Sequence, residues 1–501
     1  MKVLAIEILE FPTCFRINNT KENIKAMIDI MDDLTFIDYD GVPNPVGYSY
    51  DPNKGTLKIP KGYTLQRIQS KIKTKYTYEK IDALEVEHND LGWDVHRTPY
   101  DYQMEIINET LRHFDKGHNQ FIIDLVGGKG KTLTALFIAS KLNVPILIIC
   151  KSNELIKQWY SGLLEKTSLK IDDIYRLEGA GAINYIESMT YKHPVYISTH
   201  ATIRNIISKF GYIVLNKALN RMGVGLKIID EFDQEFKNIM DIDLNTPIMH
   251  NLYLTATTYK NSKNEDKVFQ HAFKSIKRKG GEMFLDEIPK RDMKYVYIKT
   301  YPDPLDRKVV YNYNANEFNN YRYNTYLADK KRPYLIAMLR PFIEEFRDKS
   351  DKEDICVVYC EKKETCGIVA KILSTQFGIE TKDIGIVNSD IDEYQKKENM
   401  KKKYICSTAK SLGRGIDLSL LTLGINLEVY AGESIFEQQV FRLGRTGGKH
   451  GTFVTFSDVS FSIIESWNTV KLEPGAALFD KVDLLYLDVT TGKFINRRDD
   501  L

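Results

Sequence analysis

The chain has 501 residues, of which 43% are apolar and 28% charged, and its formal net charge is +2. This composition is that of an ordinary globular protein, and no run approaches the roughly 20 uninterrupted apolar residues of a membrane span. The first residues, "MKVLAIEILEFPTCF", carry acids inside their apolar part and so differ from a signal peptide, which leads us to expect a cytoplasmic protein with no membrane partner.

A small α+β domain is predicted for residues 1–95, the first of roughly two to four domains that a chain of this length forms. Its strands are expected in "VLAIEIL", "TFIDYD" and "TLKIP". Its helices are expected in "KENIKAMIDIMDD" and "TLQRIQSKI".

A basic stretch lies in the second half of this domain. Between Lys54 and Lys80 there are eight basic residues, one acid and several tyrosines. A charge run is most often a solvated surface, but a second such run, at residues 259–280, makes a polyanion partner the better interpretation. We predict contacts with DNA phosphates from the side chains of Lys58, Lys61, Arg67, Lys71, Lys73 and Lys75.

The segment "DLVGGKGKTLTALF", residues 124–137, predicts a phosphate-binding loop between a strand and a helix. The usual pattern G-x-x-x-x-G-K-[ST] would need glycine at Leu125, so a glycine-rich turn with a chance lysine is the alternative. A phosphate site needs close backbone N–H groups, a lysine beside the β- and γ-phosphates, and a hydroxyl on Mg²⁺. The residues that meet these needs are Gly128, Gly130, Lys131 and Thr132.

Apolar runs alternate with helical segments over residues 96–290, which predicts a parallel sheet covered by helices on both faces. One of these runs, "GLKIIDEF", ends in Asp230 and Glu231. A carboxylate at a strand end can hold Mg²⁺, and its neighbour can polarise a water toward the γ-phosphate. A solvated acidic turn is the alternative for these two residues alone. Together with the glycine loop they predict an ATP and Mg²⁺ site at the carboxyl edge of the sheet.

The same alternation returns over residues 291–475, in "DICVVYC", "IGIVN", "KYICST" and "TLGINLEVY". We expect a second parallel-sheet domain there and a C-terminal tail at residues 476–501. The predicted fold is therefore α/β, with two parallel-sheet domains in tandem after the small α+β domain. The six cysteines form no C-x-x-C pair, so buried free thiols are favoured over zinc ligands or disulfides.

The motifs of the first large domain and their order resemble those of superfamily two helicases, whose fold is two tandem RecA-like domains. The segment "RTPYDYQMEI" implies that Gln103 reads the adenine base. The segment "LTAT" implies that Thr255 and Thr257 couple hydrolysis to movement, and Thr199 in "PVYIST" is assigned to DNA. The resemblance gives the catalytic roles to Lys131, Asp230 and Glu231.

Two further segments resemble motifs of the family's second domain. "STAKSLGRGIDL" implies that Gly415 and Asp417 lie near the nucleotide and Thr408 near DNA phosphate. "QQVFRLGR" resembles Q-x-x-G-R-x-G-R, with phenylalanine in place of the first glycine. It implies that three residues face the cleft between the domains: Gln438, Arg442 and Arg445.

Arginines that reach a γ-phosphate from a second domain would make hydrolysis depend on closure of the cleft. Closure is then the step that moves the protein along a strand. Ordinary exposed helix arginines are the alternative for Arg442 and Arg445.

The N-terminal domain resembles, by pattern more than by an identical motif, the one that precedes the motor in phage UvsW-type branch-migration helicases. This implies a monomer, in the host cytoplasm if phage-encoded, that acts on forks and Holliday junctions in replication, recombination or repair. Two other enzymes stay open: a duplex DNA translocase without strand separation, and an RNA helicase. The intact Lys131, Glu231 and Arg445 speak against a DNA-binding scaffold with a dead ATPase site.

Overall fold

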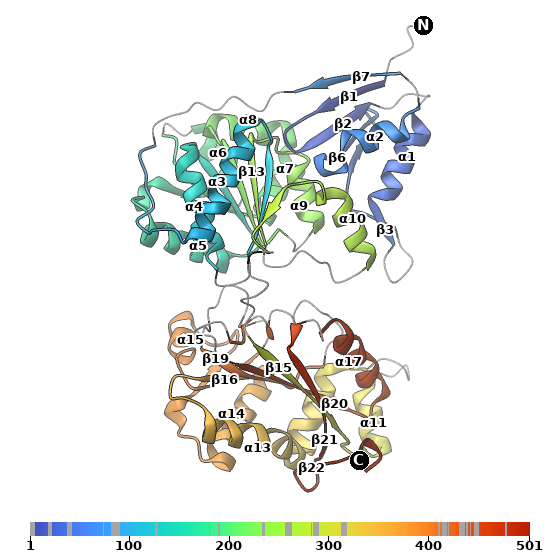
Figure 1. The fold of residues 1–501 in the computed structure, drawn as a ribbon, viewed down its shortest axis with the longest axis vertical. Coiled ribbons are helices and arrows are strands. Elements are labelled where there is room, and N and C mark those ends of the chain that lie inside the picture. The colour runs from blue at the N-terminus through green and yellow to red at the C-terminus, as the bar shows by residue number, and fades with distance from the viewer. Residues whose placement is uncertain are drawn as a thin grey trace. The chain divides into compact units, whose positions relative to one another are not determined.

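The structure is a computed structural model, and its residues separate into two compact units, Met1–Asp286 and Glu287–Leu501 (Figure 1). Each unit is described by itself. Among the described residues, no helix is long and apolar enough to cross a membrane. The structure describes residues 6–500 except 19–22, 38–42, 74, 82–90, 126–128, 180, 189–190, 233–235, 256–262, 282, 284–289, 312–317, 409–410, 413–417, 419, 430–435, 437–438, 441, 445–449 and 476–477.

The first unit begins with a five-stranded sheet in the order β5-β6-β2-β1-β7. Apolar side chains of its strands and of two helices face inward, which forms a small α+β module. Its strands are β1 (Ile6–Glu10), β2 (Cys14–Asn18), β5 (Ser49–Asp51), β6 (Thr56–Pro60) and β7 (Tyr76–Lys80). The helices are α1 (Ile24–Asp33) and α2 (Leu65–Lys71), and a separate pair consists of β3 (Thr35–Ile37) and β4 (Pro43–Pro45).

The larger sheet of the first unit has seven strands in the order β10-β11-β9-β12-β13-β8-β14, and every neighbouring pair is parallel. The central strands are short apolar runs that are buried on both faces, as parallel sheets require. Their bounds are β8 (Gln120–Asp124), β9 (Ile146–Cys150), β10 (Ile174–Arg176), β11 (Val195–Thr199), β12 (Leu226–Asp230), β13 (His250–Thr255) and β14 (Arg278–Lys279).

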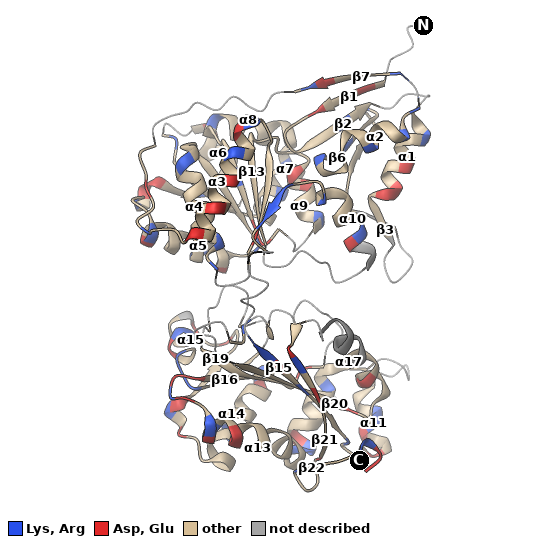
Figure 2. Ribbon diagram, viewed as in Figure 1, with Lys and Arg blue, Asp and Glu red and all other residues tan. Residues whose placement is uncertain are grey.

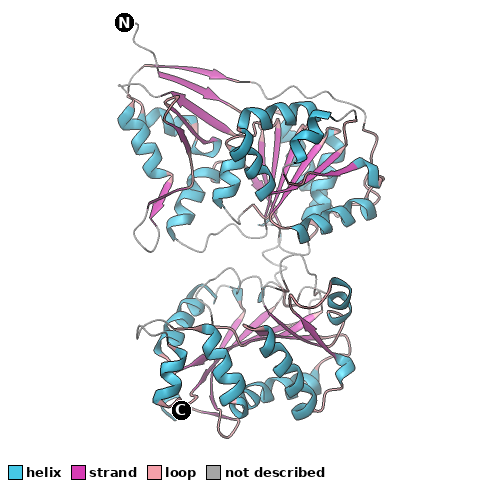
Figure 3. Ribbon diagram, turned by 180° about the vertical axis from the view of Figure 1, so that it is seen from behind, coloured by secondary structure: helices cyan, strands magenta, loops and turns pink. Residues whose placement is uncertain are grey.

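Helices cover both faces of this sheet, as the views from front and back show (Figures 1 and 3). One face packs on α3 (Asp101–Asp115), α4 (Lys131–Leu142) and α5 (Asn153–Lys166). The other packs on α6 (Gly181–Ser188), α7 (His200–Phe210), α8 (Tyr212–Met222), α9 (Phe236–Asp243) and α10 (Lys263–Phe273).

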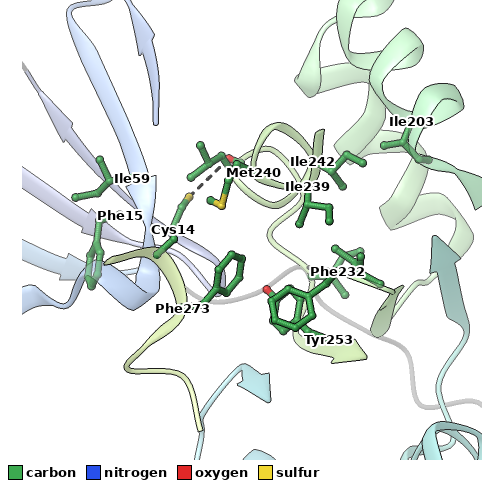
Figure 4. Packing of buried hydrophobic residues seen from close by; sticks show 14 of the residues in the cluster. Cys14, Phe15, Ile59, Ile203, Phe232, Ile239, Met240, Ile242, Tyr253 and Phe273 are labelled. Carbon is green, nitrogen blue, oxygen red and sulfur yellow. Dashed lines mark hydrogen bonds between the residues drawn. The ribbon is translucent and has the colours of Figure 1, made fainter. Parts of the chain in front are cut away.

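The small N-terminal module shares a hydrophobic core with this second face. Cys14 lies beside Met240 of α9 and Phe273 of α10, and Phe15 lies next to Ile59 in the same continuous cluster (Figure 4). At Gly62 the two parts approach so closely that a Cβ atom would lie 1.8 Å from the carbonyl oxygen of Ala272. The module is therefore built into the first unit.

The second unit contains an eight-stranded sheet in the order β17-β18-β16-β19-β20-β15-β21-β22, parallel except for β22. Its strands are β15 (Arg291–Ile298), β16 (Ile355–Cys360), β17 (Ile384–Val387), β18 (Tyr404–Thr408), β19 (Leu421–Asn426), β20 (Gly451–Asp458), β21 (Lys481–Asp488) and β22 (Lys493–Ile495). Helices include α11 (Pro304–Val310), α12 (Asn320–Thr325), α13 (Arg332–Lys349), α14 (Lys363–Phe377), α15 (Glu393–Asn399) and α17 (Ser462–Gly475).

The predicted fold class, two parallel-sheet α/β domains in tandem after a small α+β region, is confirmed. We expected residues 476–501 to be a tail, but this segment contributes two strands to the second sheet. Strand β21 pairs with β15, and β22 pairs with β21 at the edge of the sheet. All six cysteines are buried and free, as the sequence predicted.

Candidate nucleotide-binding site

The segment between β8 and α4 forms the predicted turn between a strand and a helix. Gly130, directly before α4, has φ 75° and ψ 36°, a left-handed conformation that favours glycine. A Cβ atom there would also lie 2.4 Å from Nε2 of Gln103. Lys131 begins the helix, and its Nζ donates to the carbonyl oxygen of Leu125 at 2.9 Å. Thr132 follows in the first turn, and Gly128 lies outside the described residues.

Gln103 supports this turn from the first turn of α3. Its Nε2 donates to the carbonyl oxygen of Lys129 at 3.4 Å, and its Oε1 accepts from the backbone N–H of Tyr100 at 3.0 Å. Tyr102 donates its hydroxyl to the same carbonyl of Lys129 at 3.1 Å. With 1% of its surface exposed, Gln103 contacts the loop directly, whereas its role toward a base stays a prediction.

Three neighbouring strands bring the predicted catalytic residues to one edge of the sheet. In the parallel register Asp230 pairs with Leu254, and Thr255 pairs with Asp124 at the end of β8. The carboxyl ends of β12, β13 and β8 therefore lie side by side, next to the amino end of α4. Lys131, Asp230 and Thr255 come together in this way, while Thr257 lies outside the described residues.

The Asp230–Glu231 pair occupies a constrained position at the end of β12. Asp230 is 7% exposed, and its Oδ2 accepts a hydrogen bond from the indole Nε1 of Trp159 at 2.7 Å. Glu231 has φ 52°, a left-handed conformation that is unusual for a residue with a side chain. Burial, together with the charges of both acids, raises the pKa of the Cys150 thiol well above its usual range. This cysteine therefore stays protonated beside the two carboxylates.

The residues at this edge fit a magnesium nucleotide. Mg²⁺ prefers oxygen ligands and is usually held by one or two carboxylates or hydroxyls together with substrate phosphates. Asp230 and Thr132 would supply such ligands. The amino end of α4 has no side-chain cap, so its first N–H groups are of the kind that bind phosphate.

Thr199 lies at the same edge of the sheet, at the end of β11. Its Oγ1 accepts from the backbone N–H of Thr202 at 3.1 Å and so caps α7. The capping bond gives this threonine a structural role, and contact with DNA stays a prediction.

In the second unit, the structure describes two of the predicted site residues. Thr408 ends β18, and its Oγ1 donates to Oγ of Ser411 at 2.8 Å. Arg442 is 4% exposed, and the residue after it, Leu443, accepts a hydrogen bond from Nε of the buried Arg291 at 3.1 Å. The other four lie outside the described residues: Gly415, Asp417, Gln438 and Arg445.

Four of the six basic side chains predicted to contact DNA make contacts within the first unit. Lys58 Nζ donates to Oδ1 of Asn245 at 2.8 Å and lies 3.7 Å from the centre of the Tyr212 ring. Lys61 pairs with Glu10 at 3.0 Å. Arg67 and Lys71 of α2 pair with Asp33 at the end of α1, at 3.5 and 3.0 Å (Figure 2). The remaining two, Lys73 and Lys75, are exposed.

The described part of the second basic run, residues 259–280, also makes contacts within the first unit. Lys277 and Lys279 pair with Glu109 and Glu105 of α3, at 2.5 and 3.1 Å. These pairs join β14 and the residue before it to α3.

Two residues, one in each unit, contact segments that hold predicted site residues and were not singled out by sequence reasoning. Trp159 in "KQWY" has the spacing of an ordinary core residue, and no pattern shows that its N–H meets Asp230. Arg291 stands at the start of a strand, far in sequence from the segment it supports. Both contacts depend on tertiary structure.

Comparisons with known proteins give a family match for part of the chain and a fold match for most of it. Residues 96–260 match the model of the family described as "Type III restriction enzyme, res subunit", a domain of the superfamily two helicase type. A solved fragment described as the HsdR subunit of a type I restriction enzyme from Vibrio vulnificus YJ016 is similar in fold, with a TM-score of 0.55 and 13% identity. The similarity covers 96% of this chain and 89% of that one. No curated protein matches the sequence. The family match supports a helicase-type ATPase and the structural match supports the fold, without singling out the branch-migration helicases.

Proposed function

We propose that the chain is an ATP-driven DNA motor of the helicase type, with its ATP site in the first unit. One observation carries the proposal: Lys131 and Thr132 at the start of α4 lie at the same sheet edge as Asp230 and Glu231. ATP hydrolysis uses the kinds of group found here: a lysine, a hydroxyl, two carboxylates and the N–H groups at the amino end of a helix.

Each predicted ATP-site residue of the first unit then has a defined role. Lys131 and the backbone N–H groups that follow Gly130, in the first turn of α4, bind the phosphates. Thr132 and Asp230 hold Mg²⁺. The metal, when bound, neutralises charge on the β- and γ-phosphate oxygens. Glu231 orients the attacking water and accepts its proton. Gly128 belongs to the same loop.

Residues of both units supply the remaining groups in this proposal. Arg442 and Arg445 provide positive charge to the γ-phosphate, beside Gln438, Gly415 and Asp417. Thr255 and Thr257 transmit hydrolysis to movement, while Thr199 and Thr408 bind the DNA backbone. Hydrolysis then depends on both units, so that each catalytic cycle is tied to a domain movement.

Branched DNA, such as a fork or a four-way junction, is the proposed substrate, bound by a monomer in the cytoplasm. A second candidate is translocation on duplex DNA without strand separation. It is supported by the comparisons, since the matching family and the similar structure are both described as restriction-enzyme subunits.

A single panel tests the proposal and separates the candidates. ATP hydrolysis would be measured with linear duplex, single strands, forks, four-way junctions and RNA, alongside strand displacement and triplex displacement. Stimulation by junctions with strand displacement supports branch migration. Triplex displacement without strand separation supports the duplex translocase. Stimulation by RNA alone, or no hydrolysis with any DNA, contradicts the DNA motor.

A further inference from the structure

We propose that Trp159 is a positioning residue of the ATPase site, which holds the Asp230 carboxylate in the orientation that binds Mg²⁺. The inference rests on the proposed function, because it takes Asp230 as the magnesium ligand. Trp159 would act through Asp230, as the outer partners of metal ligands do in other proteins.

The contact itself is a strong one. Nε1 of Trp159 lies 2.7 Å from Oδ2 of Asp230, and the two residues are 2% and 7% exposed. An indole N–H can only donate, and a carboxylate accepts. Hydrogen bonds to an ionised acceptor are short and about twice as strong as neutral ones. In this buried place the bond restricts the rotation of the carboxylate.

Both partners are held by rigid elements. The backbone of Asp230 is fixed by the register of β12 with β13, where it pairs with Leu254. Trp159 lies in α5, whose start is capped by Ser152, with its Oγ accepting from Leu155 N–H at 3.4 Å. Its ring packs in the core cluster on that face of the sheet. The bond thus joins two fixed points, which is what a preorganised metal ligand needs.

The ordinary alternative is that the indole only satisfies a buried acid and contributes to stability. Trp93 provides a matched control, because it is 5% exposed in the same unit and its Nε1 has no hydrogen-bond partner among the described residues. Trp→Phe at either position removes the indole and keeps an aromatic ring. Trp159→Phe alone removes a bond to Asp230.

The test measures how nucleotide binding depends on Mg²⁺ in the full chain. A fluorescent, non-hydrolysable ATP analogue would be titrated at rising Mg²⁺ and also in EDTA. We expect Trp159→Phe to need about 10–100-fold more Mg²⁺ for half-maximal binding, with wild-type affinity in EDTA. Trp93→Phe should match the wild type. Equal Mg²⁺ dependence in all three proteins overturns the inference. A wild-type protein without Mg²⁺-dependent binding overturns the proposed function first.

A second measurement covers the case in which Trp159→Phe does not fold. The chain has three tryptophans, so 5-fluorotryptophan labelling gives a simple ¹⁹F spectrum. Trp93→Phe and Trp467→Phe would assign the signals. The Trp159 signal should shift with nucleotide and Mg²⁺ but not with nucleotide in EDTA. No Mg²⁺-dependent shift contradicts the inference.

Discussion

The backbone of Glu231 carries strain at the point where the chemistry is proposed. Its φ of 52° lies in the left-handed region, which costs a residue with a Cβ atom about 1–2 kcal/mol. Such strain persists where the surrounding structure holds it, and it gathers at functional sites. Here the strand ends immediately after Asp230, and Phe232 N–H returns to the carbonyl oxygen of Leu254 at 3.1 Å.

The strain can be measured with two variants that both lack the Glu231 side chain. Glu231→Gly should be more stable than Glu231→Ala by about 1 kcal/mol, because only alanine keeps the strained Cβ atom. Urea unfolding of the two proteins gives this difference directly. Equal stability, or a more stable alanine variant, would show that the backbone relaxes at no cost.

Substitution of the same residue by glutamine addresses the chemistry. Glu231→Gln keeps the size of the side chain but cannot accept a proton from water. We expect normal binding of ATP with Mg²⁺ and hydrolysis slower on the order of a hundred-fold. Single-turnover hydrolysis measures the step itself. Turnover near the wild-type rate would assign the base to another group.

Substitution of Lys131 should affect ATP hydrolysis without affecting DNA binding. Lys131→Ala removes the ammonium beside the phosphates, so most ATP turnover should be lost, while DNA affinity stays close to that of the wild type. Lys141→Ala, in the last turn of the same helix, is the matched control and should hydrolyse ATP normally. Full hydrolysis by Lys131→Ala would remove the basis for the phosphate-binding loop.

At the scale of elements, local pattern predicted the buried strands and the strand–turn–helix context of the phosphate loop. The segment "TLKIP" coincides with β6 and "GLKIIDEF" contains β12. Contacts between distant segments could not be predicted in this way. The strand β21 pairs with β15 across nearly two hundred residues, so the C-terminal segment has no local sign of belonging to the sheet. The basic stretch around Lys58 was similarly ambiguous, because charge alone does not reveal that the Lys58 ammonium lies over the Tyr212 ring.

The close approach of the N-terminal module to α10 has a direct test at Gly62. A methyl group there would overlap the carbonyl oxygen of Ala272, which is backbone and cannot rotate away. Gly62→Ala should therefore destabilise the first unit by at least about 2 kcal/mol. Gly181→Ala, where a Cβ atom meets nothing within 4 Å, should leave stability unchanged or slightly higher. Equal melting temperatures for the two variants would mean that the module is loosely attached.

For the whole molecule, the distribution of hydrophobic cores decides which parts are able to fold alone. One continuous cluster runs from Ile6 in the N-terminal module to Ile276 beside the large sheet, so the module and the ATP-binding part share their interior. The second unit has separate clusters of its own, which contain residues from Met293 to Val489. The boundary between cores therefore lies after Asp286 and not after residue 95.

Three truncated proteins test where the boundary between the cores lies. Residues 1–286 and residues 287–501, expressed separately, should each be monomeric and unfold cooperatively, because each keeps its complete core. The first piece should bind ATP through Lys131, yet neither should hydrolyse it well, since Arg442 and Arg445 are on the other piece. Residues 96–501 contain every proposed catalytic residue but lack part of the shared core, and the exposed apolar surface should make this protein aggregate. Size-exclusion chromatography and thermal unfolding by circular dichroism compare the three. A soluble 96–501 protein with DNA-stimulated ATP hydrolysis would instead show that the N-terminal module is an independent DNA-binding attachment.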